Sequence, residues 1–240
     1  MKLLDLIFPK YCVNCKKYGN FLCTDCFSRL SFDTKNICLV CGNPSYNGLT
    51  HPGCLGKYTV DGSFTGVVFN SISKKLIYQF KYKPYLSSLS AFLAELIYES
   101  LIQNEEFNRI LHEFPPKADR QDDIFLVPIP LSSNRFKNRG YNQAEILAKA
   151  LGKKFGFEVF NALERVKETR SQVGLDKKKR KENIAGAFKL KNKLENSIKN
   201  KNFVLVDDVL TTGATISEAG KILKKAGANR VWAIAFARDQ

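Results

Sequence analysis

Residues 203–215 combine an apolar run, a pair of acids and a turn rich in threonine and glycine. The four apolar residues at 203–206 are typical of a buried parallel strand, and Asp207 and Asp208 follow them directly. In an open α/β sheet, ligands bind just outside the carboxyl ends of the strands. A helix that begins after the turn would offer free backbone N–H groups to a phosphate, and the acids can accept hydrogen bonds from vicinal hydroxyls. The segment therefore predicts a site for a sugar phosphate.

The next residues predict a helix and then a second strand. Apolar or small residues recur with a period of 3.6 after Thr215, and Gly227 is a typical helix stop. In residues 230–237, large apolar residues alternate with small ones, which is typical of a strand. The competing interpretation is an ordinary connection in which the acids only cap the helix. The combination of acids, turn and strand favours the ligand site, and no Gly-Lys-Ser/Thr follows that would make it a P-loop.

All seven cysteines fall between residues 12 and 54. Six form three pairs with two-residue spacers, and Cys54 forms a fourth such pair with His51. Such a spacer lets two side chains reach one metal, and tetrahedral zinc takes four sulfur or imidazole ligands. The expected ligands are Cys12, Cys15, Cys23, Cys26, Cys38, Cys41, His51 and Cys54. An odd number of cysteines and the lack of a recognisable secretion signal argue against disulfides. We therefore expect closed, structural zinc sites.

Several alternatives stay open for these cysteines. Eight ligands suffice for two ions, although a single ion is not excluded by the sequence. Sequential pairing is the simpler arrangement, and cross-braced pairing is the other. His51 is a lone histidine in a polar loop, which is usually solvated, but its spacing from Cys54 favours ligation.

The stretch 204–215 resembles the ribose-phosphate signature of type I phosphoribosyltransferases, which bind 5-phosphoribosyl 1-pyrophosphate (PRPP). More narrowly, the chain resembles the ComF family, competence-associated proteins that join an N-terminal zinc module to such a domain. The other motifs that carry the resemblance, in the family's order, are LVPIPL (126–131), RGYNQA (139–144), QVGL (172–175), RKEN (180–183) and GAF (186–188). With the cysteine pairs, they span nearly all of the chain.

This resemblance implies an α/β fold, with a parallel sheet covered by helices on both faces, preceded by a small double zinc-ribbon-like module. We expect the zinc module at residues 1–58 and the phosphoribosyltransferase-like domain at 59–240. The alternation of elements agrees with this fold. Strands are expected at 62–70 and 124–129, helices at 73–82, 86–103 and 140–155, and a solvated loop at 113–123. His112 would lie in a loop region and take no part in the chemistry.

The resemblance also implies roles for residues. Asp207 and Asp208 would be the catalytic pair that holds the ribose hydroxyls. The PRPP-binding residues would be Asp207, Asp208, Leu210, Thr211, Thr212, Gly213, Ala214 and Thr215, with Leu131, Ser132, Arg135, Arg139 and Arg180 around the pyrophosphate. An ordinary polar connection is the alternative for residues 131–135.

Residues 165–183 are polar and strongly basic, without clear periodicity. In the family this position resembles a mobile hood loop that closes over the pyrophosphate, and a cationic flap that excludes water would strengthen the charge interactions beneath it. A lysine-rich loop without a ligand is the alternative. Arg180 and Asn183 fall on the family's pattern.

The net charge of +15, from 38 basic and 23 acidic residues, predicts attraction to polyanions at low salt. Together with the family's link to natural transformation, this favours single-stranded DNA as a partner. The alternative is that the many lysines only form a solvated surface and bind no polyanion.

Two functions are therefore weighed. In one, a PRPP-binding protein with a zinc module handles incoming single-stranded DNA, with the DNA-uptake machinery as a further partner. In the other, an Mg²⁺-dependent phosphoribosyltransferase acts on an unknown acceptor and has no direct DNA role. The first twelve residues are too short for a signal peptide or a membrane span, so we expect a cytoplasmic protein, with association at the inner membrane surface left open.

Overall fold

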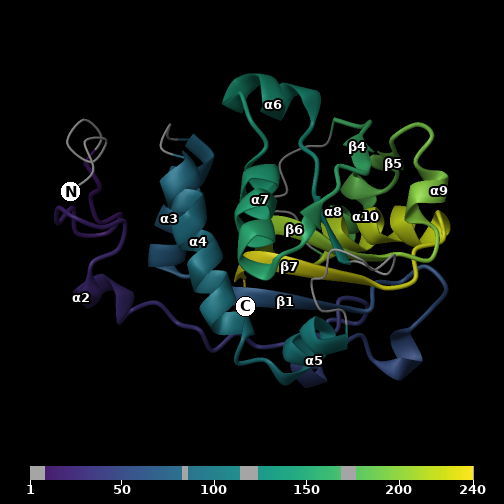
Figure 1. Cartoon of the computed structure of the whole chain (residues 1–240), viewed down its shortest axis with the longest axis horizontal. Coiled ribbons are helices and arrows are strands. Elements are labelled where there is room, and N and C mark those ends of the chain that lie inside the picture. Colours follow the sequence, from purple (N-terminus) through teal and green to yellow (C-terminus); the bar gives the residue numbers. More distant parts are fainter. Residues whose placement is uncertain (1–8, 83–85, 114–123, 169–176, 240) are drawn as a thin grey trace.

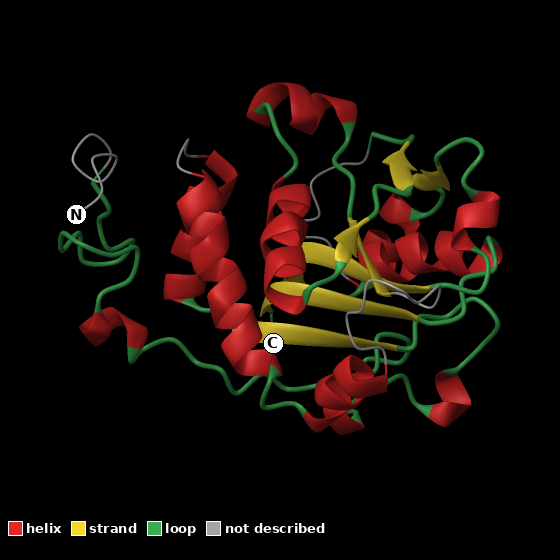
Figure 2. Cartoon of the chain, in the orientation of Figure 1, coloured by secondary structure: helices red, strands yellow, loops and turns green. Residues whose placement is uncertain are grey.

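The computed structural model describes residues 9–82, 86–113, 124–168 and 177–239, in which strands and helices alternate along most of the chain (Figures 1 and 2). Five strands form one parallel sheet in the spatial order β1-β7-β6-β2-β3. Their bounds are β1 Gly62–Val68, β2 Ile124–Pro128, β3 Glu158–Val159, β6 Asn202–Leu210 and β7 Val231–Arg238. The predicted parallel sheet is confirmed, and β6 lies at its centre.

The side chains of β6 alternate between the two faces of the sheet, because successive residues of a strand point in opposite directions. Val204 and Val206 pack on the face covered by α4 and α7, whereas Phe203 and Leu205 pack on the face covered by α10. Helices therefore cover both faces, as predicted (Figure 1). The longer helices are α3 Ser71–Tyr82, α4 Leu86–Leu101, α7 Gln143–Phe155 and α10 Ala214–Lys225.

The remaining elements are short. They are α2 Thr24–Phe27, η1 Tyr46–Gly48, η2 Pro52–Cys54, α5 Glu105–Glu113, α6 Ser133–Arg139, α8 Lys177–Ile184, α9 Glu195–Ile198 and an antiparallel ribbon of β4 Leu163–Arg165 with β5 Phe188–Leu190. The loop predicted at 113–123 lies outside the described residues, apart from its first residue, which ends α5.

The helix predicted at 140–155 begins later, at Gln143, and α6 precedes it as a separate helix. Gly140 ends α6 in the left-handed conformation, with a φ of 76°. Asn142 then caps α7, because its side chain accepts the N–H of Ala144 at 3.1 Å. Glycine and asparagine thus separate α6 from α7.

The placement of His112 in a loop was wrong, because this residue lies in the last turn of α5. The side chain of Asn104 accepts the N–H of Phe107 at 2.9 Å and so caps the helix. Phe107 and Ile110, three positions apart, are both buried. The aperiodic basic segment also differs from the expectation, because residues 177–184 form α8, whose lysines, arginine and glutamate are good helix formers.

The cysteine-rich segment runs along the free edge of β1. The N–H of Val68 donates to the carbonyl of Ser31 at 2.8 Å, and Leu49 forms an antiparallel bridge with Gly62 at the other end of the strand. The segment therefore covers the edge strand of the sheet.

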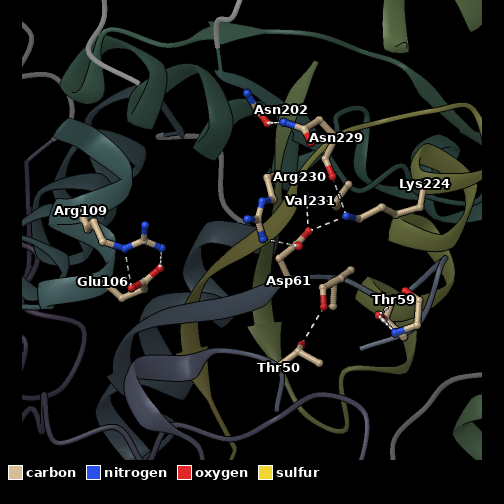
Figure 3. A network of polar contacts seen from close by, with 12 residues as sticks. Thr50, Thr59, Asp61, Glu106, Arg109, Asn202, Lys224, Asn229, Arg230 and Val231 are labelled. Carbon is tan, nitrogen blue, oxygen red and sulfur yellow. Dashed lines mark hydrogen bonds and ion pairs between the residues drawn. The ribbon is translucent and has the colours of Figure 1, made fainter. Parts of the chain in front are cut away.

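Asp61 anchors the start of β1 to the neighbouring elements (Figure 3). Its buried carboxylate accepts the N–H of Val231 at 2.7 Å and pairs with Lys224 of α10 at 2.7 Å and with Arg230 at 3.2 Å. A buried carboxylate needs such partners, since leaving its charge uncompensated is costly. Asp61 thus fixes β1, β7 and α10 relative to one another.

Candidate functional site

The sheet opens between the carboxyl ends of β2 and β6. The chain leaves β2 toward α7 on one face and leaves β6 toward α10 on the other, so this is the switch point at which α/β proteins bind ligands. A cavity of about 860 Å³ lies there. The predicted ligand-binding residues that line it are Asp207, Asp208, Leu210, Thr211, Gly213, Ala214, Thr215, Leu131, Arg135, Arg139 and Arg180. Ser132 is buried at the start of α6, and Thr212 lies within the turn without lining the cavity.

The acid pair lies within β6, which is longer than the predicted run at 203–206. Pairing with β7 continues past the acids, with Asp207 opposite Ala235. Pairing with β2 ends at Val206, opposite Pro128. The acids therefore lie where β2 no longer covers the edge of β6, and both face the cavity.

The two carboxyl groups have different electrostatic surroundings. Burial, followed by the charge of Asp208, raises the pKa of Asp207 well above its ordinary value. Burial acts in the same direction on Asp208, but the ammonium group of Lys81, which pairs with it, outweighs burial and lowers the pKa of Asp208. One acid is thus held ionised by a lysine, and its neighbour favours the protonated form in the absence of a ligand.

The turn after β6 has the geometry of an anion site. Gly213 is the N-cap of α10 and adopts the left-handed conformation, with a φ of 74°. The hydroxyl oxygen of Thr212 is buried and has no hydrogen-bond partner among the described residues. Backbone N–H groups point out of the start of a twelve-residue helix and favour a negatively charged group there.

Cationic side chains form the opposite wall. Arg135 and Arg139 extend from α6, and Arg180 extends from α8. The Nε atom of Arg180 is buried without a hydrogen-bond partner in the described parts of the chain. Burial, followed by the like charge of Arg135, lowers the pKa of Arg165. Guanidinium groups that crowd one another in this way favour an anion between them.

A carboxylate already contacts the loop predicted to hold pyrophosphate. The side chain of Glu168 accepts the N–H of Asn134 in the first turn of α6 at 3.0 Å. This hydrogen bond, helped by Arg165, lowers the pKa of Glu168. An anionic side chain therefore occupies an N–H group of this loop.

The lining residues that escaped the sequence analysis include Lys74, Tyr78, Lys81, Tyr82 and Arg165. The first four lie on α3, whose sequence signals only an amphipathic helix, and no local motif marks Lys81 as the partner of Asp208. Arg165 was noted only as the start of the basic segment. No signal in a single sequence distinguishes these cations from the many others.

The eight predicted metal ligands fall into two clusters. Cys12, Cys15, Cys23 and Cys26 form the first, and Cys38, Cys41, His51 and Cys54 form the second, with the ligand atoms of each cluster within 4.8 Å of one another. The sequential pairing is thus the one adopted. Such spacing fits four ligands around one tetrahedral zinc ion.

The surroundings of the ligands also fit zinc. Burial opposes ionisation of Cys12, but backbone N–H groups outweigh it and lower the pKa of this thiol to about 6. The same balance lowers the pKa of Cys38 to about 7. In the second cluster, Nδ1 of His51 lies 3.4 Å from Cys41 Sγ, and its Nε2 lies 2.9 Å from the carbonyl oxygen of Pro44. A carbonyl at Nε2 orients the ring so that Nδ1 can bind metal.

Comparison with known proteins agrees with both parts of the chain. The family described as double zinc ribbon domain matches residues 3–55, and the family described as phosphoribosyl transferase domain matches residues 137–240. Competence protein F of Haemophilus influenzae is 39% identical over 115 residues, covering 47% of this chain and 50% of that protein. Competence protein ComFC of Bacillus subtilis is 28% identical over 215 residues, covering 86% and 79%. DNA utilization protein YhgH of Escherichia coli K12 is 28% identical over 218 residues, covering 89% of both.

Fold and site together define a phosphoribosyl transferase domain that follows a zinc-binding double zinc ribbon. The chain is a homologue of competence protein F and of competence protein ComFC. The alignment with competence protein F spans about half of that relative. Among the described residues, no helix combines the length and apolar character needed to cross a bilayer.

Proposed function

We propose that this protein binds PRPP in the cavity between β2 and β6 and handles incoming single-stranded DNA during natural transformation. The observation that carries PRPP binding is the convergence of an acid pair, a left-handed glycine turn and several cations on one cavity. A pentose with a phosphate at one end and a pyrophosphate at the other needs these three groups.

Each part of the cavity has a role in this proposal. Asp207 and Asp208 accept hydrogen bonds from the ribose hydroxyls, and Lys81 keeps Asp208 ionised for this purpose. The 5-phosphate lies on the turn formed by Leu210, Thr211, Thr212, Gly213, Ala214 and Thr215. The pyrophosphate lies against Leu131, Ser132, Arg135, Arg139 and Arg180, and Mg²⁺ bound to it would neutralise part of its charge.

Turnover is the second candidate function, as an Mg²⁺-dependent phosphoribosyl transfer to an acceptor without a direct role for DNA. The raised pKa of Asp207 favours it, because a carboxyl group that holds its proton more readily can exchange that proton with an acceptor. In that case the pair Asp207 and Asp208 would be catalytic.

The DNA part of the proposal rests on charge and on the relatives. The net charge is +15, and the relatives carry names that refer to competence and DNA utilization. We infer that the protein works in the cytoplasm, at the inner surface of the membrane where DNA-uptake proteins would be its partners.

Titration calorimetry with PRPP and Mg²⁺ tests the binding. We expect heat from the wild-type protein, and none from the Asp207→Asn, Asp208→Asn variant with its zinc content unchanged. Asp25→Asn, which alters an exposed acid on α2, is the matched control. A wild-type protein that gives no heat overturns the proposal. Pyrophosphate release in the presence of nucleobases, amines or DNA would establish turnover, and binding without release would favour the binding protein.

A further inference from the structure

Two tyrosines stand side by side at the rim of the cavity. Tyr78 and Tyr82 lie one turn apart on α3 and both line the cavity. Their ring centroids are 5.0 Å apart, and the ring planes meet at 46°, so neither ring stacks face to face on the other. Tyr78 is 61% exposed and Tyr82 is 58% exposed. More than half of each tyrosine side chain is therefore open to a ligand.

The fold does not need these side chains in its core. The buried side of α3 is formed by Ile72, Leu76 and Phe80, whereas the two tyrosines project from another side. By contrast, Tyr141 uses its hydroxyl to donate to the carbonyl of Phe80 at 2.8 Å. This contact within the fold accounts for Tyr141, whereas packing does not account for Tyr78 and Tyr82.

Cations flank the pair. The guanidinium group of Arg139 lies 5.2 Å from the ring centroid of Tyr82 and donates to its hydroxyl at 3.4 Å. Lys74 is exposed one turn before Tyr78, so Lys74, Tyr78 and Tyr82 form a stripe along α3. A stripe that joins exposed aromatic rings to positive charge at both ends suits a chain that carries both phosphates and flat bases.

We propose that Lys74, Tyr78, Tyr82 and Arg139 form a binding site for single-stranded DNA, in which unpaired bases stack on the tyrosines and phosphates contact the cations. The strand then passes across the mouth of the PRPP cavity. This inference rests on the DNA role proposed above and assigns that role to a surface. Single strands are required, because a paired base cannot offer its face to a side chain at the surface.

Fluorescence anisotropy with a short labelled oligothymidylate tests the site. We expect the Tyr78→Leu, Tyr82→Leu variant to bind roughly tenfold more weakly or worse, because each lost base–ring stack removes a substantial part of the affinity. Tyr78→Phe, Tyr82→Phe keeps both rings and retains the affinity. Lys74→Met reduces the dependence of the affinity on salt, whereas the tyrosine substitutions leave it unchanged.

The chain contains a matched control pair. Tyr11 and Tyr18 are also exposed, at 47% and 58%, but lie beside the first metal cluster and meet edge to face at 71°. We expect Tyr11→Leu, Tyr18→Leu to bind like the wild type. Equal losses in both double variants, or unchanged affinity after Tyr78→Leu, Tyr82→Leu, overturn the site. A wild-type protein without affinity for the oligonucleotide overturns the DNA role itself. An unchanged zinc content and an unchanged melting temperature in every variant show that the fold is intact.

Discussion

The side chain of Leu39 packs directly against Gly213. An added Cβ atom on Gly213 would lie 2.8 Å from Cδ2 of Leu39, which is only 1% exposed. Leu39 follows the metal ligand Cys38, and Gly213 caps the helix whose start forms the proposed phosphate turn. The second metal cluster therefore supports the wall of the cavity through Leu39.

Gly213→Ala is expected to weaken PRPP binding by roughly tenfold or more. Alanine is strained at a φ of 74°, which costs about 1 kcal/mol, and its Cβ would also push Leu39 or the turn aside. Titration calorimetry measures the loss. Gly186→Ala is the matched control, since its φ is 68° but no described atom lies within 4 Å of the added Cβ. If both variants lost a similar amount of PRPP affinity, backbone strain and not the contact with Leu39 would be the cause.

The two metal clusters are expected to affect the cavity unequally. Cys41→Ser removes an exposed ligand of the second cluster, and Cys15→Ser removes an exposed ligand of the first. Each variant should lose about one equivalent of zinc by elemental analysis. PRPP affinity should fall several-fold in Cys41→Ser, because Leu39 is no longer held against Gly213, and should stay near the wild-type value in Cys15→Ser. Equal affinities for PRPP in the two variants would contradict this coupling.

Lys81→Met should make stability depend on pH in a new way. In the wild-type protein the lowered pKa of Asp208 stabilises the fold above the ordinary carboxyl range, and this contribution is lost as the pH falls through the lowered value. Without Lys81, burial raises the pKa of Asp208, so a penalty grows as the pH rises above about 4.

The difference in unfolding free energy between wild type and Lys81→Met should therefore widen from about pH 4 toward about pH 8, reaching about 3 kcal/mol. Denaturant melts at several pH values measure it. Lys221→Met alters an exposed lysine of α10 and should show a flat difference. If the difference in unfolding free energy between wild type and Lys81→Met were constant over this range, the ion pair would not be the cause of the destabilisation.

Glu168→Gln is expected to tighten PRPP binding several-fold. The carboxylate of Glu168 accepts the N–H of Asn134, so a pyrophosphate on this loop must compete with an anion already present. Glutamine removes the charge while keeping the size of the side chain. Calorimetry with PRPP and Mg²⁺ measures the change, and Glu158→Gln, on the exposed strand β3, is the control. Weaker binding in Glu168→Gln would show instead that Glu168 assists the ligand.

Much of the site could be predicted because its residues are contiguous. The strand, the acids and the turn at 203–215 form one local pattern, and the paired cysteines form another. The exact end of β6 could not be predicted, since pairing with β7 and not hydropathy carries the strand past Asp207 and Asp208 to Leu210. The domain boundary after residue 58 stays a prediction.

Other features depend on contacts between distant parts of the chain. Lys81 pairs with an acid 127 positions away in the sequence, and Leu39 reaches a glycine in the last third of the chain. Neither contact leaves a periodic signal. His112 is a different case, because the cap at Asn104 and the pair Phe107 and Ile110 were visible in the sequence and were overlooked.

The segment that runs beside β1 has one more consequence, for handling the protein. A bare outer strand presents a row of backbone donors and acceptors on which another molecule can dock, and this protein shields that row with the stretch that carries its metal ligands. Chelators would detach the metal-binding segment from β1 before the sheet itself unfolds. Protein from which zinc has been removed should therefore aggregate while its sheet remains folded, and zinc in the buffer should prevent this aggregation.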